Sequence, residues 1–511
     1  MMAKLNLVLA VVLVLVLSQL ALAAPGPSKY TVVHLTEYCR HGGRTGFSYF
    51  PSKDKLSELG YGTLTGNGQR MHYLLGKQIR ADYPSIFNDS QPLTNADIEI
   101  LSSSISRTIQ SAWSQLAGLF PQGKGDNITV IPSQISSYLP AYKEPIDVTG
   151  LNYEFALENG LRMYPLQVKS AELDFVFTPH EAKPNCPEYS KLDMSLRAKQ
   201  YEKYAFLIGS LAVDLEAAGF SSKELFGKPK WDIGTLGLLA DEIISYKYYY
   251  GKIPPELSEA VWKSLQRFQD FKFFLDFSDR RQTLVRGEQA AKAILQGMQD
   301  FVKGVPYRRK FRLFSGHDSG LHPHTIMLNL TDLNCNLQKM QFDVPTRPCE
   351  SSPAFAANYL YELNRDQDTQ KHYVRVLYNG KPIKICDQNQ DDYYCEFSDF
   401  KTKYSQLMFS QDPNEFFALC GNPHIQNAQK TEDAKARMEQ DPFIAVYFGV
   451  IAIVLMLSLI IWRFLKIKHD LDDEEDHDAI IAKLKESKKA MNDTSQEYLQ
   501  IDANKSLDRN I

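Results

Sequence analysis

The chain has no excess of basic residues and no internal repeat. Its 511 residues include 57 Lys or Arg and 61 Asp or Glu, which gives a formal net charge of −4. Nucleic acid is therefore excluded as a general partner, because proteins that cover a phosphate backbone carry a basic surface. The hydrophobic fraction of 44% and the charged fraction of 23% exclude collagen-like and wholly disordered chains. A mean hydropathy of −0.32 also excludes a membrane protein with many spans.

The first of two long apolar runs lies at the N-terminus. Residues 7–17 are eleven consecutive apolar residues that follow Lys4. Ala21-Leu22-Ala23 then matches the small-x-small pattern of a cleavage site. A charged start, a short apolar centre and small residues at the cut are typical of a secretory signal peptide, and the run is short for an uncleaved anchor. We therefore expect residues 1–23 to be a cleaved signal peptide.

The second apolar run, residues 443–462, contains twenty residues and no charge. At about 1.5 Å per residue, a helix of this length spans the ~30 Å hydrocarbon core of a bilayer. Arg463 and two lysines follow directly, which places the C-terminal side in the cytosol by the positive-inside rule. The sequence therefore predicts a single-pass type I membrane protein, with residues 24–442 luminal or extracellular and residues 463–511 cytosolic.

The predicted cytosolic tail carries most of the net negative charge and one short motif. It contains nine Lys or Arg and twelve Asp or Glu, a charge of −3, which leaves −1 for the rest of the chain. Tyr498 and Ile501 fit a tyrosine-x-x-apolar sorting signal, in which an extended peptide offers two side chains to an adaptor protein. A functional signal predicts delivery to lysosomes or endosomes, and without one we expect the cell surface.

All seven cysteines precede the second apolar run, as expected for a domain that folds in an oxidising compartment. The odd number leaves one thiol unpaired, and no Cys-x-x-Cys motif supports a zinc or redox site. The same part of the chain contains three Asn-x-Ser/Thr sequons, at Asn88, Asn127 and Asn329. We expect these three asparagines to be glycosylated in a secretory protein.

Strand and helix patterns alternate at both ends of the large domain. Runs rich in β-branched and aromatic residues predict strands, and apolar residues at helical spacing predict helices. The expected strands are 30–38, 98–102, 310–314 and 373–378, and the expected helices are 64–83, 107–119, 192–218 and 258–274. The fold class is therefore α/β, with a core of two segments, about 28–150 and 304–425, whose sheet is flanked by helices. We expect the segment between them, about 151–303, to form a mainly α-helical cap.

Three short motifs dense in arginine and histidine follow predicted strands. The first is Arg40-His41-Gly42-Gly43-Arg44, after the strand that ends near Tyr38. Two guanidinium groups on one tight loop can clamp a dianion, because each offers a planar fork that matches phosphate oxygens. His41 lies between them and is expected to meet the bound anion.

The other two motifs add a third arginine and a His-Asp pair. Arg107 begins the helix after strand 98–102, where the helix N-terminus also favours an anion. In Gly316-His317-Asp318-Ser319-Gly320, His317 can bind phosphate and the carboxyl of Asp318 can act as a general acid. Ligand sites of α/β sheets collect at the carboxyl ends of strands, so we expect the motifs to meet. Taken singly, each motif also fits a solvated surface loop.

In this order, the three motifs resemble the histidine acid phosphatase family, which is branch 2 of the histidine phosphatase superfamily. The Arg-His-Gly-x-Arg and His-Asp combination is specific, and segments 64–80 and 353–380 are also similar to that family. The resemblance covers roughly residues 30–420. It implies a central mixed β-sheet flanked by helices, an α-helical cap, and a membrane-anchored acid phosphatase of the lysosomal or prostatic type.

The resemblance also implies the roles of the site residues. His41 would be the nucleophile that forms a phosphohistidine, and Asp318 would protonate the leaving alcohol. The phosphoryl oxygens would be bound by Arg40, Arg44, Arg107 and His317. No cofactor and no metal are expected, because the arginines would supply the charge that Mg²⁺ supplies elsewhere. An acidic optimum is expected, since Asp318 must be protonated at the chemical step.

Some positions depart from the family pattern. A proline is common where Gly46 stands, and an aspartate is common where Gly43 stands. The usual Arg and Asp ahead of the position of Arg107 are replaced by Leu101 and Ser104. None of these changes removes a catalytic group, so we expect them to affect substrate preference.

The resemblance implies two disulfides, Cys186 with Cys420 and Cys386 with Cys395. The pair Cys335 with Cys349 is a hypothesis for the third, because six cysteines allow fifteen pairings. Cys39, next to Arg40, would then be the free thiol.

We therefore expect a metal-independent acid phosphatase that hydrolyses phosphate monoesters. Selectivity for inositol polyphosphates or lysophosphatidate is an alternative, although the near-neutral domain disfavours a strongly basic cap. An inactive receptor or adhesion protein on the same scaffold is an alternative of another class, which the intact set of catalytic residues disfavours. A homodimer is left open.

Overall fold

The computed structural model describes most of the large domain and short helical pieces near the C-terminus. The described residues are 29–47, 59–123, 125–128, 140, 154–170, 174–177, 186–342, 349–386, 393–412, 414–421, 456–463, 465–466 and 481–489. The chain divides into two units, residues 1–423 and 424–511. The expected signal peptide, residues 443–455 of the expected membrane span, and the Tyr498–Ile501 motif lie outside the described residues. Within the described ranges, no helix is both long and apolar enough to cross a bilayer.

A mixed β-sheet forms the core of the first unit, in agreement with the expected fold class. Its order is β3 (Leu166–Val168), β2 (Ile98–Ser102), β4 (Phe311–Gly316), β1 (Tyr30–Arg40), β5 (Asn358–Asp366), β6 (His372–Tyr378) and β7 (Lys381–Ile383), with β8 (Cys395–Glu396) paired to β6. The strands from β3 to β1 are parallel, whereas β5, β6 and β7 continue the sheet in antiparallel pairs. The carboxyl ends of β1, β2 and β4 therefore lie at the same edge of the sheet.

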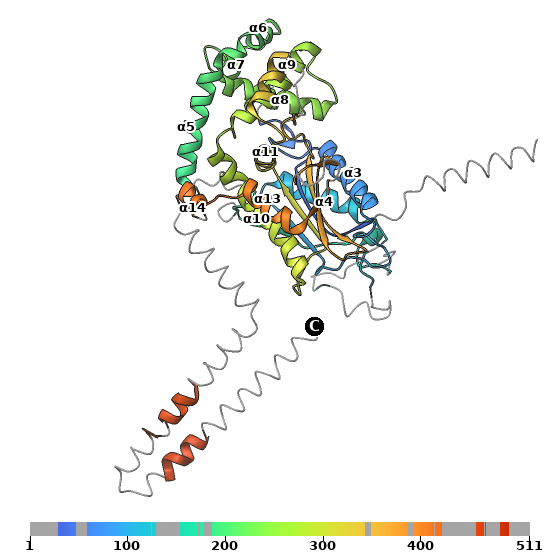
Figure 1. Cartoon of the computed structure of the whole chain (residues 1–511), viewed down its shortest axis with the longest axis vertical. Coiled ribbons are helices and arrows are strands. Elements are labelled where there is room, and N and C mark those ends of the chain that lie inside the picture. Colours follow the sequence, from blue (N-terminus) through green and yellow to red (C-terminus); the bar gives the residue numbers. More distant parts are fainter. Residues whose placement is uncertain are drawn as a thin grey trace, which may run out of the picture. The chain divides into compact units, whose positions relative to one another are not determined.

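Two layers of helices cover the two faces of this sheet (Figure 1). Leu35 and Cys39 of β1 pack in the apolar cluster with α3 (Gly66–Asp82) and α4 (Ser106–Leu119). Tyr38 points to the other face, into the cluster with α10 (Arg280–Lys303), α11 (Asp318–Met327) and α13 (Phe397–Met408). This alternation is the period of two that a strand between two packed layers requires.

A third apolar cluster belongs to the cap, whose helices gather at one end of the unit (Figure 1). Its helices are α5 (Pro187–Tyr204), α6 (Gly209–Ala217), α7 (Ser222–Phe226), α8 (Ile233–Tyr250) and α9 (Glu259–Leu275), with α12 (Leu333–Phe342) packed against them. The cap is narrower than the expected segment 151–303. β3 belongs to the core sheet, and Ala290, Ile294 and Met298 of α10 pack on that sheet. Helical spacing predicts an apolar face but does not say which partner buries it.

The expected strands and helices correspond to elements of the structure, with small shifts at their ends. The expected helix 192–218 is interrupted, because α5 ends at Tyr204 and the 3₁₀ helix Ala205–Ile208 precedes α6. β5 was not among the expected strands, although it is the antiparallel partner of β1. Nearly all of its residues are buried on both faces, so polar and apolar positions do not alternate along it.

α3 and α4 cross at a distance that only glycine permits. A Cβ at Gly76 would lie 2.2 Å from the carbonyl oxygen of Gln115, and a Cβ at Gly118 would lie 2.1 Å from that of Tyr73. Both contacts are much shorter than a van der Waals distance, so any larger residue would separate the helices. The close crossing brings His72 of α3 against Gln115 of α4, with 2.9 Å between Nδ1 and Oε1.

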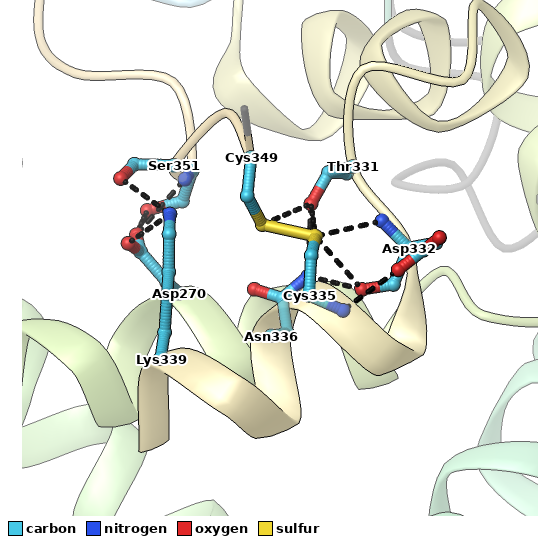
Figure 2. The surroundings of a disulfide bond; sticks show 9 residues. Asp270, Thr331, Asp332, Cys335, Asn336, Lys339, Cys349 and Ser351 are labelled. Carbon is cyan, nitrogen blue, oxygen red and sulfur yellow. Dashed lines mark hydrogen bonds and ion pairs between the residues drawn. A yellow bond between two sulfur atoms is a disulfide. The ribbon is translucent and has the colours of Figure 1, made fainter. Parts of the chain in front are cut away.

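Three disulfides cross-link the first unit, and they are the pairs named from the sequence. They join Cys186 to Cys420, Cys335 to Cys349 and Cys386 to Cys395, and Cys39 is a buried free thiol. Figure 2 shows the second of these bonds, between α12 and the start of segment 349–355. Beside it, Lys339 contacts Asp270 of α9 at 3.5 Å and the hydroxyl of Ser351 at 3.1 Å. These contacts fix a segment that continues into the candidate site.

Candidate active site

The three arginine and histidine motifs meet at the carboxyl edge of the parallel strands. In the register of the sheet, Arg40 of β1 pairs with Gly316 of β4, and Ser102 of β2 pairs with Ser315. The backbone N–H of His41 donates to the carbonyl of Gly316 at 3.0 Å. The strand order β2-β4-β1 thus brings together segments that lie more than 200 residues apart.

His41 lies at the centre of this edge and is 2% exposed. Its Nδ1 lies 2.8 Å from the carbonyl oxygen of Gly42. Because a carbonyl only accepts hydrogen bonds, Nδ1 carries the proton and Nε2 keeps its lone pair. Burial, together with the charges of Arg40 and Arg107, holds the pKa of His41 well below its usual range. The imidazole is therefore neutral even in acid and can act as a nucleophile.

Arg40 and Asp318 form an ion pair beside His41. Nη2 of Arg40 lies 2.7 Å from Oδ2 of Asp318, and Nη1 donates to the carbonyl of Pro353 at 2.5 Å. The Nε atom of Arg40 is buried and has no acceptor within the described part of the chain. Burial alone would raise the pKa of Asp318, but the charges of Arg40 and Arg44 outweigh it and lower that pKa. Asp318 is therefore ionised in this arrangement.

Arg44 is held by the cap helix α8. Nη2 donates to both carboxylate oxygens of Asp241, at 2.8 and 2.9 Å, and Nη1 donates to the hydroxyl of Ser245 and the carbonyl of Thr45, at 3.1 and 3.0 Å. These bonds use four of the five N–H groups of the guanidinium. The fifth, on Nε, is buried and has no acceptor among the described residues. Buried donors of this kind are normally paired, so Nε is available to an anion.

Arg107 and the neutral His317 complete the wall of the site. Nη2 of Arg107 lies 3.4 Å from Nδ1 of His317, and Nε2 of His317 lies 2.9 Å from the hydroxyl of Ser103. A guanidinium only donates, so Nδ1 accepts and Nε2 carries the proton. Burial and the charge of Arg107 lower the pKa of His317 to about 3, which keeps it neutral. The rings of His317 and His41 lie 5.5 Å apart, so both face one site.

Segment 349–355 closes the site from the side of α9 and α12. It supplies the carbonyl of Pro353 to Arg40, and the guanidinium of Arg40 lies 4.2 Å from the ring centroid of Phe355. The same ring lies 5.7 Å from that of His41 and 4.9 Å from that of Tyr248 in α8. Phe355 is 4% exposed, so its ring packs against the Arg40 guanidinium away from water, where a cation over an aromatic face is stabilised.

The structure brings the six site residues expected from the sequence to one place and adds four that sequence reasoning missed. The six are Arg40, His41, Arg44, Arg107, His317 and Asp318, and the four are Ser103, Asp241, Glu242 and Ser245. Three of the four belong to α8, where nothing in the sequence separates them from ordinary polar positions of an amphipathic helix. Their role depends on the docking of the cap helix against the first motif.

Gly46, which stands where the family pattern has proline, is explained by Glu242. Oε1 of Glu242 accepts a hydrogen bond from the backbone N–H of Phe47 at 2.6 Å. A Cβ at Gly46 would lie 1.7 Å from Oε2 of the same carboxylate. The absence of a side chain at Gly46 therefore lets α8 approach the loop that carries Arg44.

The three sequon asparagines, Asn88, Asn127 and Asn329, are exposed at the surface. In the ranges that the structure describes, no group of three or more His, Cys, Asp or Glu side chains is arranged to hold a metal ion.

Comparison with known proteins places the whole site within one family. Residues 28–379 match the model of the histidine phosphatase superfamily (branch 2). The chain belongs to branch 2 of the histidine phosphatase superfamily. All six expected site residues lie within the matched region.

Individual relatives are distant. The chain is 23% identical to prostatic acid phosphatase of Homo sapiens over 322 residues, and this alignment covers 60% of the chain and 72% of the relative. It is 24% identical to lysosomal acid phosphatase of Xenopus laevis over 323 residues, and this alignment covers 61% of the chain and 64% of the relative. Among solved structures, the phytase of Klebsiella sp ASR1 has a TM-score of 0.50 and 13% identity and covers 74% of this chain and 96% of its own. A Hafnia alvei phytase in complex with tartrate also has a TM-score of 0.50, with 16% sequence identity. The match covers 77% of this chain and 99% of the phytase chain. These two structures share the fold of this histidine phosphatase.

Gly46→Ala tests the contact between α8 and the first motif. The added Cβ collides with Glu242, so the loop that carries Arg44 must move. We expect kcat/KM for an aryl phosphate to fall by about tenfold or more, because displacements near 1 Å at a catalytic site have effects of this size. Gly43→Ala is the matched control, since its Cβ would lie no closer than 3.5 Å to any neighbour. Equal activity of the two variants would contradict the packing described here.

Proposed function

We propose that this histidine phosphatase is an acid phosphatase that hydrolyses phosphate monoesters through a phosphohistidine on His41. The observation that carries the proposal is a neutral imidazole whose unprotonated Nε2 faces buried arginines. The Nε donors of Arg40 and Arg44, which have no acceptor among the residues that the structure describes, can donate to the oxygens of a tetrahedral dianion. An inactive receptor on this scaffold is disfavoured, because such a protein has no need to keep these costly buried charges.

The first step would transfer the phosphoryl group to His41. The Nε2 lone pair forms a bond to phosphorus while the bond from phosphorus to the leaving oxygen breaks. Charge on the transferring group spreads over oxygens that Arg40, Arg44 and Arg107 can bind. Asp318 gives its proton to the leaving oxygen, so an alcohol departs and Asp318 becomes a carboxylate.

The second step would hydrolyse the phosphohistidine. The oxygen of a water molecule attacks phosphorus while Asp318 takes a proton from that water. The bond between phosphorus and Nε2 of His41 breaks, and inorganic phosphate leaves. Asp318 must be protonated before each turnover, yet the charges of Arg40 and Arg44 lower its pKa. A bound phosphate shares these two cations and lowers their effect on Asp318. Activity is therefore expected to be highest in acid and to fall as pH rises.

His41→Ala tests the nucleophile. In the full-length chain, purified in detergent from a secretory host, we expect kcat for an aryl phosphate to fall by about 10³-fold or more. Acid quenching of the wild type during turnover should trap a phosphorylated chain, which His41→Ala should not form.

His372→Ala is the control for this experiment, because His372 lies half-buried on β6. It should retain wild-type activity. Wild-type activity that disappears with a chelator would contradict the metal-independent reaction, and near-normal turnover by His41→Ala would contradict the nucleophile.

A pocket beside the site favours a second candidate, a substrate whose leaving group carries further anions, such as an inositol polyphosphate. A cavity of about 780 Å³ lies between α8, α9, α12 and segment 351–355, and Arg40 and Phe355 line its inner end. Its cationic lining residues are Arg40, Lys247, Lys263, Arg267 and Lys339, against the single carboxylate of Asp270. The near-neutral net charge of the domain is thus compatible with a local excess of positive charge. A lysophosphatidate would use instead the apolar wall at Trp262.

The double variant Lys247→Ala/Lys263→Ala separates these substrates. Both lysines line the pocket, and Lys247 lies 4.5 Å from the ring centroid of Trp262. If a polyanion is the substrate, kcat/KM for inositol hexakisphosphate should fall by about tenfold while that for an aryl phosphate stays unchanged. Lys223→Ala/Lys230→Ala removes two exposed cap lysines outside the pocket and serves as the control. An equal loss for both substrates would contradict the second candidate.

We further propose that the catalytic domain is luminal or extracellular, held by residues 443–462 and glycosylated at the three sequons. The three disulfides and the exposure of the sequon asparagines support this location. Tyr498 and Ile501 would bind a sorting adaptor, which would direct the protein to lysosomes or endosomes.

Tyr498→Ala tests the sorting signal. Loss of the tyrosine should move the steady-state protein from lysosomes to the cell surface, as measured by surface biotinylation. Tyr394→Ala, in the luminal domain, is the control for a general effect of removing a tyrosine. An unchanged distribution of Tyr498→Ala would dismiss the signal.

A further inference from the structure

Behind the catalytic loop, buried polar side chains form a hydrogen-bonded line. His72 Nε2 lies 3.0 Å from the carbonyl oxygen of Arg40, and His72 Nδ1 lies 2.9 Å from Oε1 of Gln115. Nε2 of Gln115 donates to Oε2 of Glu37, and Asn358 donates to Oε1 of Glu37 at 2.8 Å. His72, Gln115 and Glu37 are fully buried. The line therefore joins the backbone of Arg40 to a carboxyl group that the proposed reaction does not use.

This line requires a definite number of protons. The carbonyl of Arg40 only accepts, so that contact needs the proton on Nε2 of His72. The amide of Gln115 can donate to His72 or to Glu37 but not to both, because its other end is a carbonyl. The remaining contact needs one more proton, either on Nδ1 of His72 or on Glu37. Once that proton is lost, two acceptors must face each other at one of three contacts: Arg40 with His72, His72 with Gln115, or Gln115 with Glu37. The first of these contacts holds the backbone of Arg40.

Burial favours placing the shared proton on Glu37. It raises the pKa of Glu37 to about 7, although hydrogen bonds from Asn358 and Gln115 partly offset the effect. Burial also lowers the pKa of His72. The other titratable neighbour is Cys39 on the same strand, and no described Lys or Arg forms an ion pair with Glu37. With Glu37 protonated, the side-chain amide of Gln115 must be turned by 180° from the orientation given above. Its carbonyl then accepts from Glu37, and its NH₂ group donates to His72.

We propose that Glu37, Gln115 and His72 are positioning residues that hold Arg40 for oxyanion binding only while the line keeps its shared proton. The proposal rests on the proposed phosphatase function and adds an acid requirement to it. That requirement is separate from the protonation of Asp318, which faces the substrate. When the shared proton is lost, one contact of the line opens, the backbone at Arg40 loosens, and the site binds oxyanions less tightly.

The same proton affects folding. The folded-state pKa of Glu37, about 7, lies above the ordinary value of 4.5. Between these two pH values the folded chain binds a proton that the unfolded chain does not bind. The stability associated with Glu37 is therefore fully present in acid and is lost as pH rises through 7.

Glu37→Gln tests the proposal, because glutamine has the shape and the hydrogen bonds of the protonated carboxyl. Its amide can donate to Gln115, and its carbonyl can accept from Asn358. We expect the melting temperature at pH 8 to exceed that of the wild type by about 2 °C or more, with little difference at pH 5.

Binding of tungstate to the full chain measures the effect on the site. Tungstate is a tetrahedral dianion whose charge stays constant near neutral pH, so any change in its affinity comes from the protein. For the wild type we expect the affinity to weaken by up to about tenfold between pH 6 and pH 8, because the fraction of molecules that keep the shared proton falls. For Glu37→Gln the affinity should stay nearly constant.

Glu362→Gln is the matched control on the neighbouring strand β5. The carboxylate of Glu362 is equally buried but accepts from Arg375 and from the hydroxyl of Tyr83, so glutamine there should lower stability at both pH values. Two results would overturn the proposal. One is a Glu37→Gln variant that is less stable than the wild type at pH 8, and the other is a variant whose tungstate affinity falls with pH as the wild type's does. A wild type without phosphatase activity would instead refute the proposed function, and the melting temperatures would still report on the proton.

Discussion

Repulsion between the buried Arg40 and Arg44 is the constraint on which the site depends. They face one edge of the sheet beside the half-buried Arg107, and each of the two would be unstable there without a compensating group. Asp318 of α11 neutralises Arg40, and Asp241 of α8 neutralises Arg44. One carboxylate comes from the core and the other from the cap, so the site is complete only when both have folded and docked.

Burial, together with the same arginines, determines the protonation of the histidines. Burial and the neighbouring cations keep His41 and His317 neutral, and neutral rings need defined hydrogen-bond partners for each nitrogen. Gly42 and Ser103 supply these partners and thereby fix which nitrogen carries the proton. The charges that would bind phosphate in the proposed reaction thus also prepare the nucleophile.

Chemistry carried by short motifs was predictable from the sequence. Arg40, His41 and Arg44 lie within five residues, and Arg107, His317 and Asp318 each follow a strand end, so local pattern was enough to single them out. The long strands and helices were predictable for the same reason, because their periodicity is local. β5 and the true extent of the cap were not, because the burial of β5 on both faces and the packing of α10 on the sheet come from the tertiary fold.

The sequence by itself determined the family, the candidate site residues and the positions of the two apolar runs. Only the tertiary structure decided which groups pair with the charges of the site residues. Asp241 and Glu242 act because α8 docks on the first motif, and the line from Glu37 to Arg40 exists because Gly76 and Gly118 let α3 and α4 approach. The physical reason is that a pKa, an ion pair or a shared proton depends on distance and burial. These are set by residues far away in the chain, and no local pattern records them.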